Sequence, residues 1–285
     1  METLAAQEAG KFDAVVEEKK QLESQLATLT RTNEAARKTA EDAALQQPFL
    51  QLLGLIAPRR VEGHRKLRAG RDADGGYVML DDFEGLRTAI SGGIGNEVTW
   101  DLAMAVRGID VIQVDHTVPG PPVSHPRFVF RQQRLVGIPE LDYDVTLADL
   151  IAACPGEDDS IVCKLDIEGA EWNVLARPVA GLRRCRQIVV EFHQLHRFGS
   201  TEWRTKAMAC FEQINADFQC IHVHGNNAAP IVVVGGVTFP SVVEATFVRR
   251  DRYTFEEETA SFPAPLDAPN IAGRAEILIG RFPVS

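Results

Sequence analysis

Three acidic residues follow a short apolar run near the middle of the chain. The run Ile161-Val162-Cys163 is typical of a strand that is buried on both faces of a parallel sheet. Asp166, Glu168 and Glu171 come next, with Gly169 among them, and the residues after the glycine have helical spacing. Glu171 fits the first turn of that helix, where the helix dipole favours an acid. Asp166 instead lies at the carboxyl end of the strand, where open α/β sheets bind ligands, so we predict a functional site there.

Histidines and further carboxyl groups follow two later apolar segments. One predicted strand ends in Glu191 and His193, and the next predicted strand ends in His224. Because the carboxyl ends of parallel strands meet at one edge of a sheet, these groups are expected to lie near Asp166. Of His222 and His224 we expect only one to face the site, and we choose His224 because it adjoins the glycine of H-G-N-N. The candidate catalytic residues are Asp166, His193, Glu191 and His224.

A glycine-rich turn between a predicted strand and a predicted helix precedes this region. The strand at 86–91 ends in S-G-G-I-G-N-E, and a helix is predicted at 98–107. The next strand, 109–114, ends in Asp115, twenty residues after Gly95. Glycines let a ligand approach the backbone, helix N–H groups face it, and an acid accepts hydrogen bonds from ribose hydroxyl groups. This order of elements predicts a nucleotide-like ligand.

The residues of this turn favour one kind of ligand. G-G-I-G-N-E is not G-x-G-x-x-G, because Glu97 and Val98 stand where the third glycine would pack helix against strand, so a dinucleotide is disfavoured. S-adenosylmethionine has no pyrophosphate, needs fewer glycines and tolerates an acid, since its amino acid end carries an ammonium group. On a third predicted strand, 127–132, Gln132 or Gln133 could reach an adenine edge. The candidate cofactor-binding residues are Gly92, Gly93, Gly95, Glu97, Asp115 and Gln132.

Composition and charge limit the classes of function. The 285 residues suit one domain plus an appendage, and the net charge of −10 argues against nucleic acid or an anionic membrane as the main partner. No apolar run approaches the ~20 residues of a membrane span, and the N-terminus lacks the basic region of a secretion signal. The five cysteines are odd in number and lack C-x-x-C spacing, which indicates reduced thiols rather than a zinc site. We therefore expect a cytoplasmic protein.

Residues 1–47 are predicted to form a helical arm, and residues 48–285 the domain that holds the site. Apolar residues of the arm recur at alternating spacings of 4 and 3, which is typical of a coiled coil. Asn33 at a core position favours two strands. We predict a homodimer through a parallel coil, with a single helix folded back on its own domain as the alternative. The two rows of core positions are Phe12, Lys19, Leu26, Asn33 and Ala40, and Val15, Leu22, Leu29, Ala36 and Ala43.

A charged turn follows the arm. Asp74-Gly75-Gly76 predicts a tight turn that leads into a short strand at 77–80. Arg71, Asp72 and Asp74 bring more charge to this turn than its geometry requires. A plain hairpin and a cap over a polar ligand both fit the sequence.

Several of these motifs resemble those of one family. K-L-D-I-E-G-A-E-W-N-V-L closely resembles the signature segment of the FkbM-like S-adenosylmethionine-dependent O-methyltransferases, and D-G-G-Y-V, G-I-G-N-E-V-T-W-D and H-G-N-N look like companion motifs. The resemblance covers about residues 60–250. It implies a Rossmann-like, seven-stranded α/β methyltransferase sheet with the cofactor over the first two strands. It also implies an acceptor hydroxyl group near the ends of the fourth and fifth strands.

The family's acceptors are hydroxyl groups of sugars, glycolipids and polyketide-type metabolites, and no segment of this chain identifies its own acceptor. The first strand end here lacks the acid that often precedes the glycine loop in methyltransferases, and Glu97 is the residue that could compensate.

Two mechanisms fit the candidate residues. The methyl sulfonium of the donor is already activated, so the enzyme must orient the acceptor and remove its proton. In the first mechanism, His193 or His224 is the base and Asp166 or Glu191 orients it. In the second, Asp166, Glu191 and His193 hold a Mg²⁺ or Mn²⁺ ion that lowers the pKa of the acceptor hydroxyl. The sequence does not choose between them.

Two other functions compete with methyl transfer. A nicotinamide-dependent oxidoreductase shares the glycine turn and Asp115 but does not account for the acidic motif around Asp166. A non-catalytic coiled-coil assembly protein with a degenerate methyltransferase domain would lack site residues, and none of the expected ones is missing.

Overall fold

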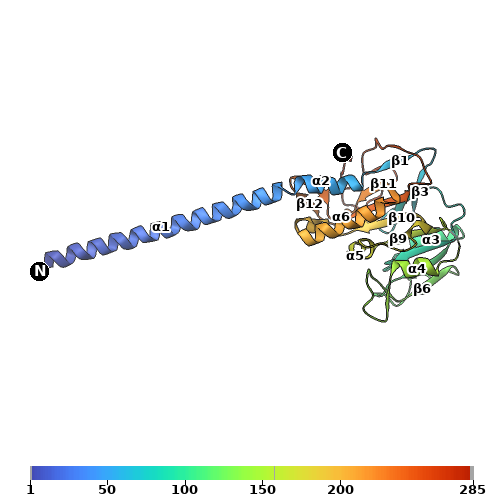
Figure 1. The fold of residues 1–285 in the computed structure, drawn as a ribbon, viewed down its shortest axis with the longest axis horizontal. Coiled ribbons are helices and arrows are strands. Elements are labelled where there is room, and N and C mark those ends of the chain that lie inside the picture. The colour runs from blue at the N-terminus through green and yellow to red at the C-terminus, as the bar shows by residue number, and fades with distance from the viewer. Residues whose placement is uncertain (1, 157, 283–285) are drawn as a thin grey trace.

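A seven-stranded sheet forms the centre of the domain in this computed structural model, which describes residues 2–156 and 158–282, with side chains from residue 19 onward (Figure 1). All strands are parallel except β14, which is antiparallel to both of its neighbours. In spatial order the strands are β11 (Phe218–Gly225), β14 (Val243–Arg249), β10 (Cys185–Phe192), β9 (Ile161–Leu165), β4 (Thr88–Gly92), β5 (Asp110–Val114) and β6 (Phe128–Arg131).

The helices and four small two-stranded sheets surround this central sheet. The helices are α1 (Glu2–Ala43), α2 (Gln46–Leu55), α3 (Thr99–Val106), α4 (Leu147–Ala153), α5 (Glu171–Leu175), α6 (Thr201–Asn215) and the 3₁₀ turns η1 (Leu182–Arg184) and η2 (Leu195–Gly199). The small sheets pair β1 (Arg59–Val61) with β15 (Phe255–Glu257), β2 (Lys66–Ala69) with β3 (Tyr77–Leu80), β7 (Arg134–Leu135) with β8 (Asp144–Val145), and β12 (Ile231–Val234) with β13 (Val237–Pro240).

The chain order confirms a mixed α/β fold around a seven-stranded sheet. The chain enters at β4 and proceeds outward to β5 and β6, then returns to the other side of β4 at β9 and continues to β10. The strand order therefore reverses between β4 and β9, and such a reversal is where doubly wound sheets bind ligands. The apolar segment β12, which looked like a sheet strand from its sequence, pairs with β13 outside the central sheet.

The central strands are buried on both faces because alternate side chains enter two separate cores. Cys163 and Leu165 of β9 belong to the larger core, which α2, α4, α5 and α6 cover. Val162 of the same strand belongs to the smaller core, which contains Trp100 of α3 and Tyr77 of β3. This explains why the strand sequences are continuously apolar rather than alternating.

The arm is a single helix that projects away from the domain (Figure 1). Residues 19–44 are exposed, so the alternative in which the arm folds back on its own domain is wrong. Leu22, Leu26 and Leu29 are 59%, 66% and 58% exposed. The side chains of Phe12 and Val15, which the heptad pattern includes, lie outside the described residues. The chain then turns, and α2 packs its apolar side chains into the larger core.

The segment after β15 lies against β11 and the small sheets. Asp267 contacts His222, and Glu276 contacts His224. Leu278 of this segment is 83% exposed. Ile277, in contrast, lies beside Gly225.

The five cysteines are free and buried, as their spacing predicted. Burial raises the pKa of the Cys163 thiol well above its usual value, which keeps it protonated. In the part of the chain that the structure describes, no helix has the length and apolar character that crossing a membrane requires.

Candidate functional site

A cleft of about 490 Å³ opens at the reversal of strand order, between the carboxyl ends of β4, β5 and β9. Cofactor and small-molecule sites typically have volumes of about 300–1,000 Å³. Its walls come from the glycine turn, the residues after β5, the β6–β7 connection and the acidic motif after β9. The predicted site residues on its walls are Gly93, Gly95, Glu97, Asp115 and Asp166.

The glycines of the turn have separate roles. Gly93 has a φ of +75°, and a Cβ there would lie 1.7 Å from the carbonyl oxygen of Asp166, so only glycine fits. Gly95 also has a positive φ, +46°, and no atom lies within 4 Å of its Cβ position, which leaves its face open. Gly92 is not on the cleft wall: a Cβ there would meet Leu135 and Leu165 at 2.9 and 3.1 Å. Gly92 therefore serves packing beneath the cleft.

Asp115 holds the glycine turn in place. Its Oδ2 accepts hydrogen bonds from the backbone N–H groups of Ile94 (3.0 Å) and Gly95 (2.9 Å), and its Oδ1 accepts from the N–H and the hydroxyl of Thr117 (2.7 and 2.6 Å). Burial alone would raise the pKa of Asp115, but the bonds from Thr117 and Gly95 hold it below its usual value. The ionised carboxylate thus fixes the backbone that a ligand would contact.

The predicted cofactor role of Asp115 gives one expected result: replacing Asp115 by alanine should weaken binding of the predicted cofactor, S-adenosylmethionine, by about 1–3 kcal/mol, because charged hydrogen bonds that shape the turn are lost. Isothermal titration calorimetry on the folded variant measures this directly. Asp110→Ala, at the exposed start of the same strand, is a matched control that should keep full affinity. Unchanged affinity in a folded Asp115→Ala variant would refute this role.

Glu97 and one of the two candidate glutamines line the cleft. Glu97 Oε1 accepts a hydrogen bond from the N–H of Thr99 at the start of α3 (2.5 Å), and its Oε2 pairs with Arg71 Nη1 at 2.9 Å. The charged turn near Arg71 therefore borders the cleft. Of the two candidate glutamines, Gln133 lines the cleft and Gln132 is exposed outside it. Neighbouring residues of an extended segment point to opposite sides, and the sequence did not show which one faces inward.

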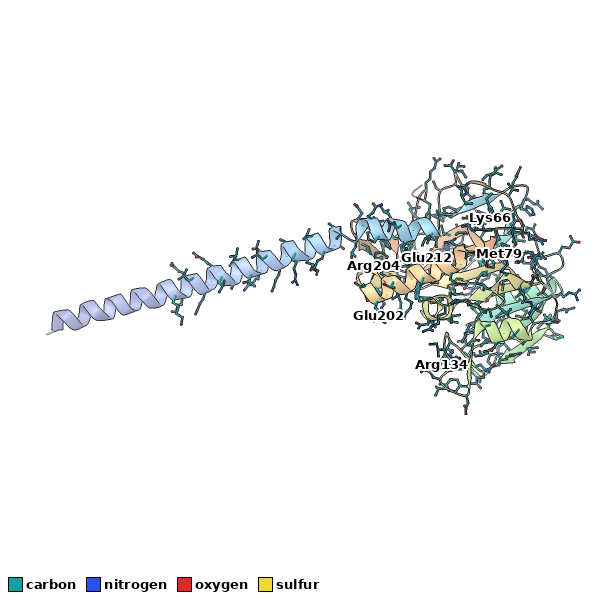
Figure 2. The ribbon with its side chains drawn as sticks, in the orientation of Figure 1. Lys66, Met79, Arg134, Glu202, Arg204 and Glu212 are labelled. Carbon is teal, nitrogen blue, oxygen red and sulfur yellow. The ribbon has the colours of Figure 1, made fainter. Side chains whose placement is uncertain are left out.

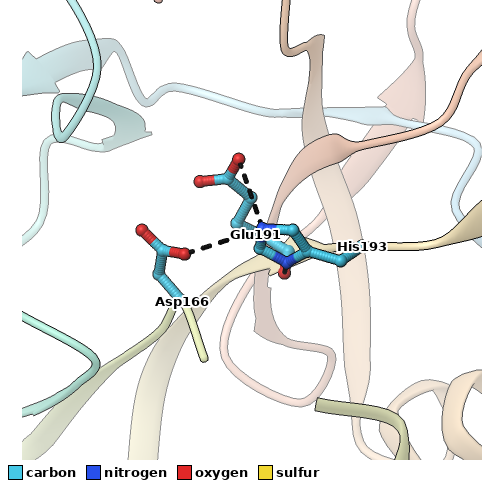
Figure 3. Close-up of side chains that lie close together, drawn as sticks. All are labelled: Asp166, Glu191 and His193. Carbon is cyan, nitrogen blue, oxygen red and sulfur yellow. Dashed lines mark hydrogen bonds and ion pairs between the residues drawn. The ribbon is translucent and has the colours of Figure 1, made fainter. Parts of the chain in front are cut away.

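Asp166, Glu191 and His193 come together beside the cleft (Figure 3). One ligand atom from each lies within 4.8 Å of the others. Nε2 of His193 is 4.0 Å from Asp166 Oδ1 and 3.9 Å from Glu191 Oε1. The three residues follow or end β9 and β10, which are neighbours in the sheet. We call them the acidic cluster.

Three residues outside the candidate catalytic set support this cluster. Tyr77 donates a hydrogen bond to Asp166 Oδ2 (2.9 Å), and its hydroxyl lies 3.4 Å from Glu191 Oε2. Asn226 donates to Glu191 Oε1 at 2.6 Å. The third is Glu171, which is fully buried.

Glu171 orients the imidazole from behind. Its Oε1 lies 3.0 Å from Nδ1 of His193 and also accepts hydrogen bonds from the N–H groups of Ile167 (3.0 Å) and Gly169 (3.2 Å). The expectation that Glu171 is simply a first-turn helix acid is therefore incomplete, although it does begin α5. Since Nδ1 is held by Glu171, Nε2 points to the other carboxylates.

The protonation states of the cluster follow from burial and charge. Burial, and then the charges of Asp166 and Glu244, raise the pKa of Glu191 well above its usual value, which favours the protonated carboxyl group. Burial alone would lower the pKa of His193, but the hydrogen bond to Glu171 and the surrounding carboxylates raise it to about 9. His193 is therefore an imidazolium at neutral pH.

The two loops that carry the cluster are strained and closely packed. Glu168 and Gln194, each two residues or fewer from a cluster member, have left-handed φ angles of 57° and 66°. A Cβ on Gly169 would lie 2.3 Å from Nε2 of Gln194. Non-glycine residues hold such angles at a cost of order 1–3 kcal/mol, and they concentrate at functional sites.

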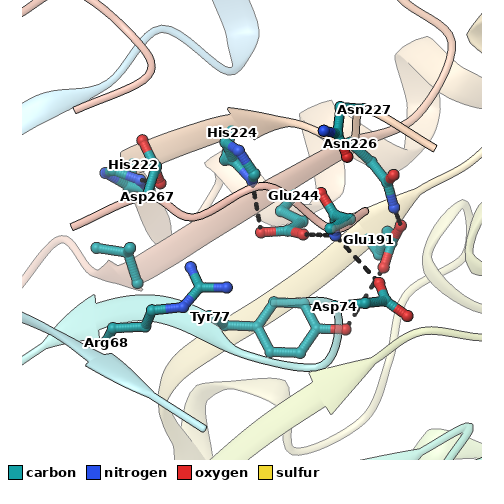
Figure 4. Close-up of polar contacts among 12 residues, drawn as sticks. Arg68, Asp74, Tyr77, Glu191, His222, His224, Asn226, Asn227, Glu244 and Asp267 are labelled. Carbon is teal, nitrogen blue, oxygen red and sulfur yellow. Dashed lines mark hydrogen bonds and ion pairs between the residues drawn. The ribbon is translucent and has the colours of Figure 1, made fainter. Parts of the chain in front are cut away.

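His224 lies in an adjoining buried network rather than in the cluster itself (Figure 4). Its Nδ1 is 3.1 Å from Glu244 and its Nε2 is 3.2 Å from Glu276. Burial alone would lower the pKa of His224, but Glu244 raises it to about 9. His222 and His224 pair with Thr246 and Glu244 of β14 and lie on one face, since residues two apart in a strand share a face. The expectation that only one would face this side was wrong.

The acidic cluster is suited to a divalent cation. Two carboxyl groups and one imidazole are ligands that Mn²⁺ accepts readily, whereas Mg²⁺ prefers oxygen. A metal-binding histidine usually has its second ring nitrogen hydrogen-bonded to a carboxylate, and Glu171 supplies that contact at Nδ1 of His193. A cation at Nε2 would have to displace the proton of His193 and bind Glu191 as a carboxylate; in that deprotonated state the donor set and the orientation of the ring fit a cation.

The fold and the cleft define an α/β domain with a glycine-lined cleft beside an acidic cluster. The family model of the methyltransferase FkbM domain matches residues 144–219, which include Asp166, Glu191 and His193. This match confirms the predicted resemblance to FkbM-like methyltransferases and indicates a methyltransferase in general. The glycine turn and the arm lie outside the matched residues. No curated protein matches the chain.

Proposed function

We propose that the protein is an S-adenosylmethionine-dependent O-methyltransferase that acts on a hydroxyl group of a sugar, glycan, glycolipid or secondary metabolite. The observation that carries this proposal is the position of Asp166. Asp166 lies on the wall of the cleft and is also a member of the acidic cluster. A donor in the cleft and an acceptor at the cluster would therefore meet at one carboxylate, inside the segment that matches the methyltransferase family.

The side chains around Asp166 suit the removal of a proton from an acceptor. S-adenosylmethionine supplies an activated methyl group, so the protein has to orient the hydroxyl oxygen and accept its proton. The raised pKa of His193, about 9, keeps a proton on its ring at neutral pH, and Glu191 has a raised pKa and accepts a hydrogen bond from Asn226. In the absence of a cation, Asp166 is the member of the cluster that is left to accept the proton, while Tyr77 fixes its Oδ2.

A divalent cation at the cluster is part of this proposal. Asp166, Glu191 and His193 would hold Mg²⁺ or Mn²⁺ in place of the protons on His193 and Glu191, and the cation would lower the pKa of the acceptor hydroxyl as a Lewis acid. The carboxylates of Asp166 and Glu168 near His193 Nε2 support a positive charge at that position.

Removing divalent cations with EDTA is expected to abolish turnover, and adding back Mn²⁺ or Mg²⁺ should restore it. Calorimetric titration of the EDTA-treated protein with Mn²⁺ gives a second, activity-independent measurement, and His193→Ala should weaken that binding. If EDTA leaves turnover unchanged, Asp166 acts as a base without a metal.

Two experiments test the proposed function itself. Calorimetric titration with S-adenosylhomocysteine and, separately, with NAD compares methyl transfer with the nicotinamide-dependent alternative, and binding of NAD alone would reject the proposal. A transfer assay with labelled methyl donor against glycan and metabolite extracts of the source organism then identifies the acceptor. Incorporation of label that requires Asp166 is the expected result.

The arm and the cellular location belong to the same proposal. The exposed leucines of α1 support a coiled-coil homodimer. The five buried, free cysteines support a reducing, cytoplasmic environment.

A further inference from the structure

A lysine lies in the middle of an otherwise apolar buried strand. Lys164 belongs to β9, and every residue of that strand is buried. Lys164 itself is only 3% exposed, yet it lines the cleft. Lysine is almost never this buried unless its charge is compensated, because desolvating an ammonium group is costly.

The protein compensates this charge only in part. Lys164 Nζ donates a hydrogen bond to the carbonyl oxygen of Gly93 (2.8 Å) and lies 5.8 Å from the centre of the Tyr77 ring. Within residues 2–156 and 158–282, no carboxylate lies within the 4.0 Å of an ion pair with Nζ, although Asp101 and Asp166 are on the same side of the sheet. An ammonium group has three N–H donors, so Nζ retains donors for a ligand.

Asp101 does not supply the missing partner. Its Oδ1 accepts a hydrogen bond from Gln113 Nε2 at 2.8 Å. Burial raises the pKa of Asp101, and the charge of Lys164 opposes that rise. The two groups therefore interact electrostatically without forming an ion pair. Lys164 is on the cleft wall, so a ligand bound in the cleft can supply the missing partner.

We propose that Lys164 binds the carboxylate of the amino acid portion of S-adenosylmethionine. This inference rests on the proposed function. Asp115 and Gln133 lie on the β5 and β6 side of the cleft, where an adenosine would extend. The methyl group must lie near Asp166. The amino acid end then lies toward Gly93 and Lys164, and a carboxylate there completes the coordination of a buried cation.

A pair of ligands that differ only in the carboxylate tests this role. Full-length protein is titrated calorimetrically with S-adenosylmethionine and with decarboxylated S-adenosylmethionine. The wild type should bind the carboxylated ligand about 10- to 100-fold more tightly, the range expected for a buried charge-assisted contact. Lys164→Met should remove this preference by weakening S-adenosylmethionine binding alone, leaving the affinity for the decarboxylated ligand within about threefold.

Controls separate this role from a structural one. Lys66→Met is the matched control, because Lys66 is a partly buried lysine whose charge is paired with Glu258 at 3.2 Å. Lys66 does not line the cleft, and it lies away from Arg134, which does (Figure 2). This variant should keep the wild-type preference. Lys164→Gln keeps a donor for Gly93 without the charge, and it replaces Lys164→Met if that variant fails to fold.

Each remaining outcome counts against the inference or against its basis. Equal loss of affinity for both ligands in the Lys164 variants would show that Lys164 merely supports the glycine turn, and would overturn the assignment. A wild type that binds both ligands equally would also overturn it. A wild type that binds neither ligand would instead reject the proposed methyl donor, so the two failures are distinguishable.

Discussion

Asp166→Asn is expected to lower turnover by about 10²-fold or more while leaving the fold and the affinity for S-adenosylmethionine unchanged. Asparagine keeps the shape of the side chain and can still accept the hydrogen bond from Tyr77. It removes the charge that would accept a proton or bind a cation at the cluster. The loss should therefore appear in kcat rather than in donor binding.

The measurement combines a methyl-transfer assay on the identified acceptor with calorimetry for the donor. Asp81→Asn is a matched control, because Asp81 lies outside the cleft and pairs with Arg65 at the surface. His193→Ala should show a comparable loss, since His193 is the neighbouring member of the cluster. Near-normal turnover in both Asp166→Asn and His193→Ala would place the site elsewhere.

The strands were predictable because each is a dense apolar segment that ends in turn residues. The predicted strand 109–114 corresponds to β5 at Asp110–Val114, and the predicted helix 98–107 to α3 at Thr99–Val106. Glu191 and His193 were predictable for the same reason, since the parallel order brings the ends of neighbouring strands together. Regular periodicity thus fixes the position of residues at strand ends.

The supporting residues could not be predicted in this way. Tyr77 is 89 residues from Asp166 along the chain, and Asn226 is 35 residues from Glu191. Their contacts depend on how β3 and the exit of β11 pack, which no local pattern encodes. Lys164, in contrast, could have been recognised from the sequence, because a lysine inside a buried apolar run is itself a signal of function.

Asp115 was placed correctly from the sequence, but its hydrogen-bond partners differ from those predicted. Asp115 lies on the cleft wall as its distance from Gly95 suggested, yet its carboxylate accepts hydrogen bonds from the protein's own backbone. A spacing rule gives the position of an acid at the end of a strand. It does not show whether a ligand or the neighbouring loop uses its lone pairs.

Deleting residues 1–41 is expected to convert the proposed homodimer into a folded monomer that still binds the proposed methyl donor, S-adenosylmethionine. From residue 19 to residue 44 the helix is exposed, and an isolated helix gains little stability without a partner. The exposed leucines at 22, 26 and 29 have the 4 and 3 spacing of a coiled-coil seam. The truncation keeps Asp42, whose Oδ1 accepts a hydrogen bond from the N–H of Gly235 (3.3 Å), and the whole of α2.

Size-exclusion chromatography with multi-angle light scattering measures the change in mass across a range of protein concentrations. Replacing both Leu26 and Leu29 by glutamate in the full-length chain should dissociate the dimer as well, because two seam layers would then carry like charges. Ser24→Glu lies on the opposite face of the same helix and should leave the dimer intact. A truncated protein that remains dimeric would show that the subunits meet through the globular domain. A full-length protein that is monomeric at all concentrations would contradict dimerisation through α1.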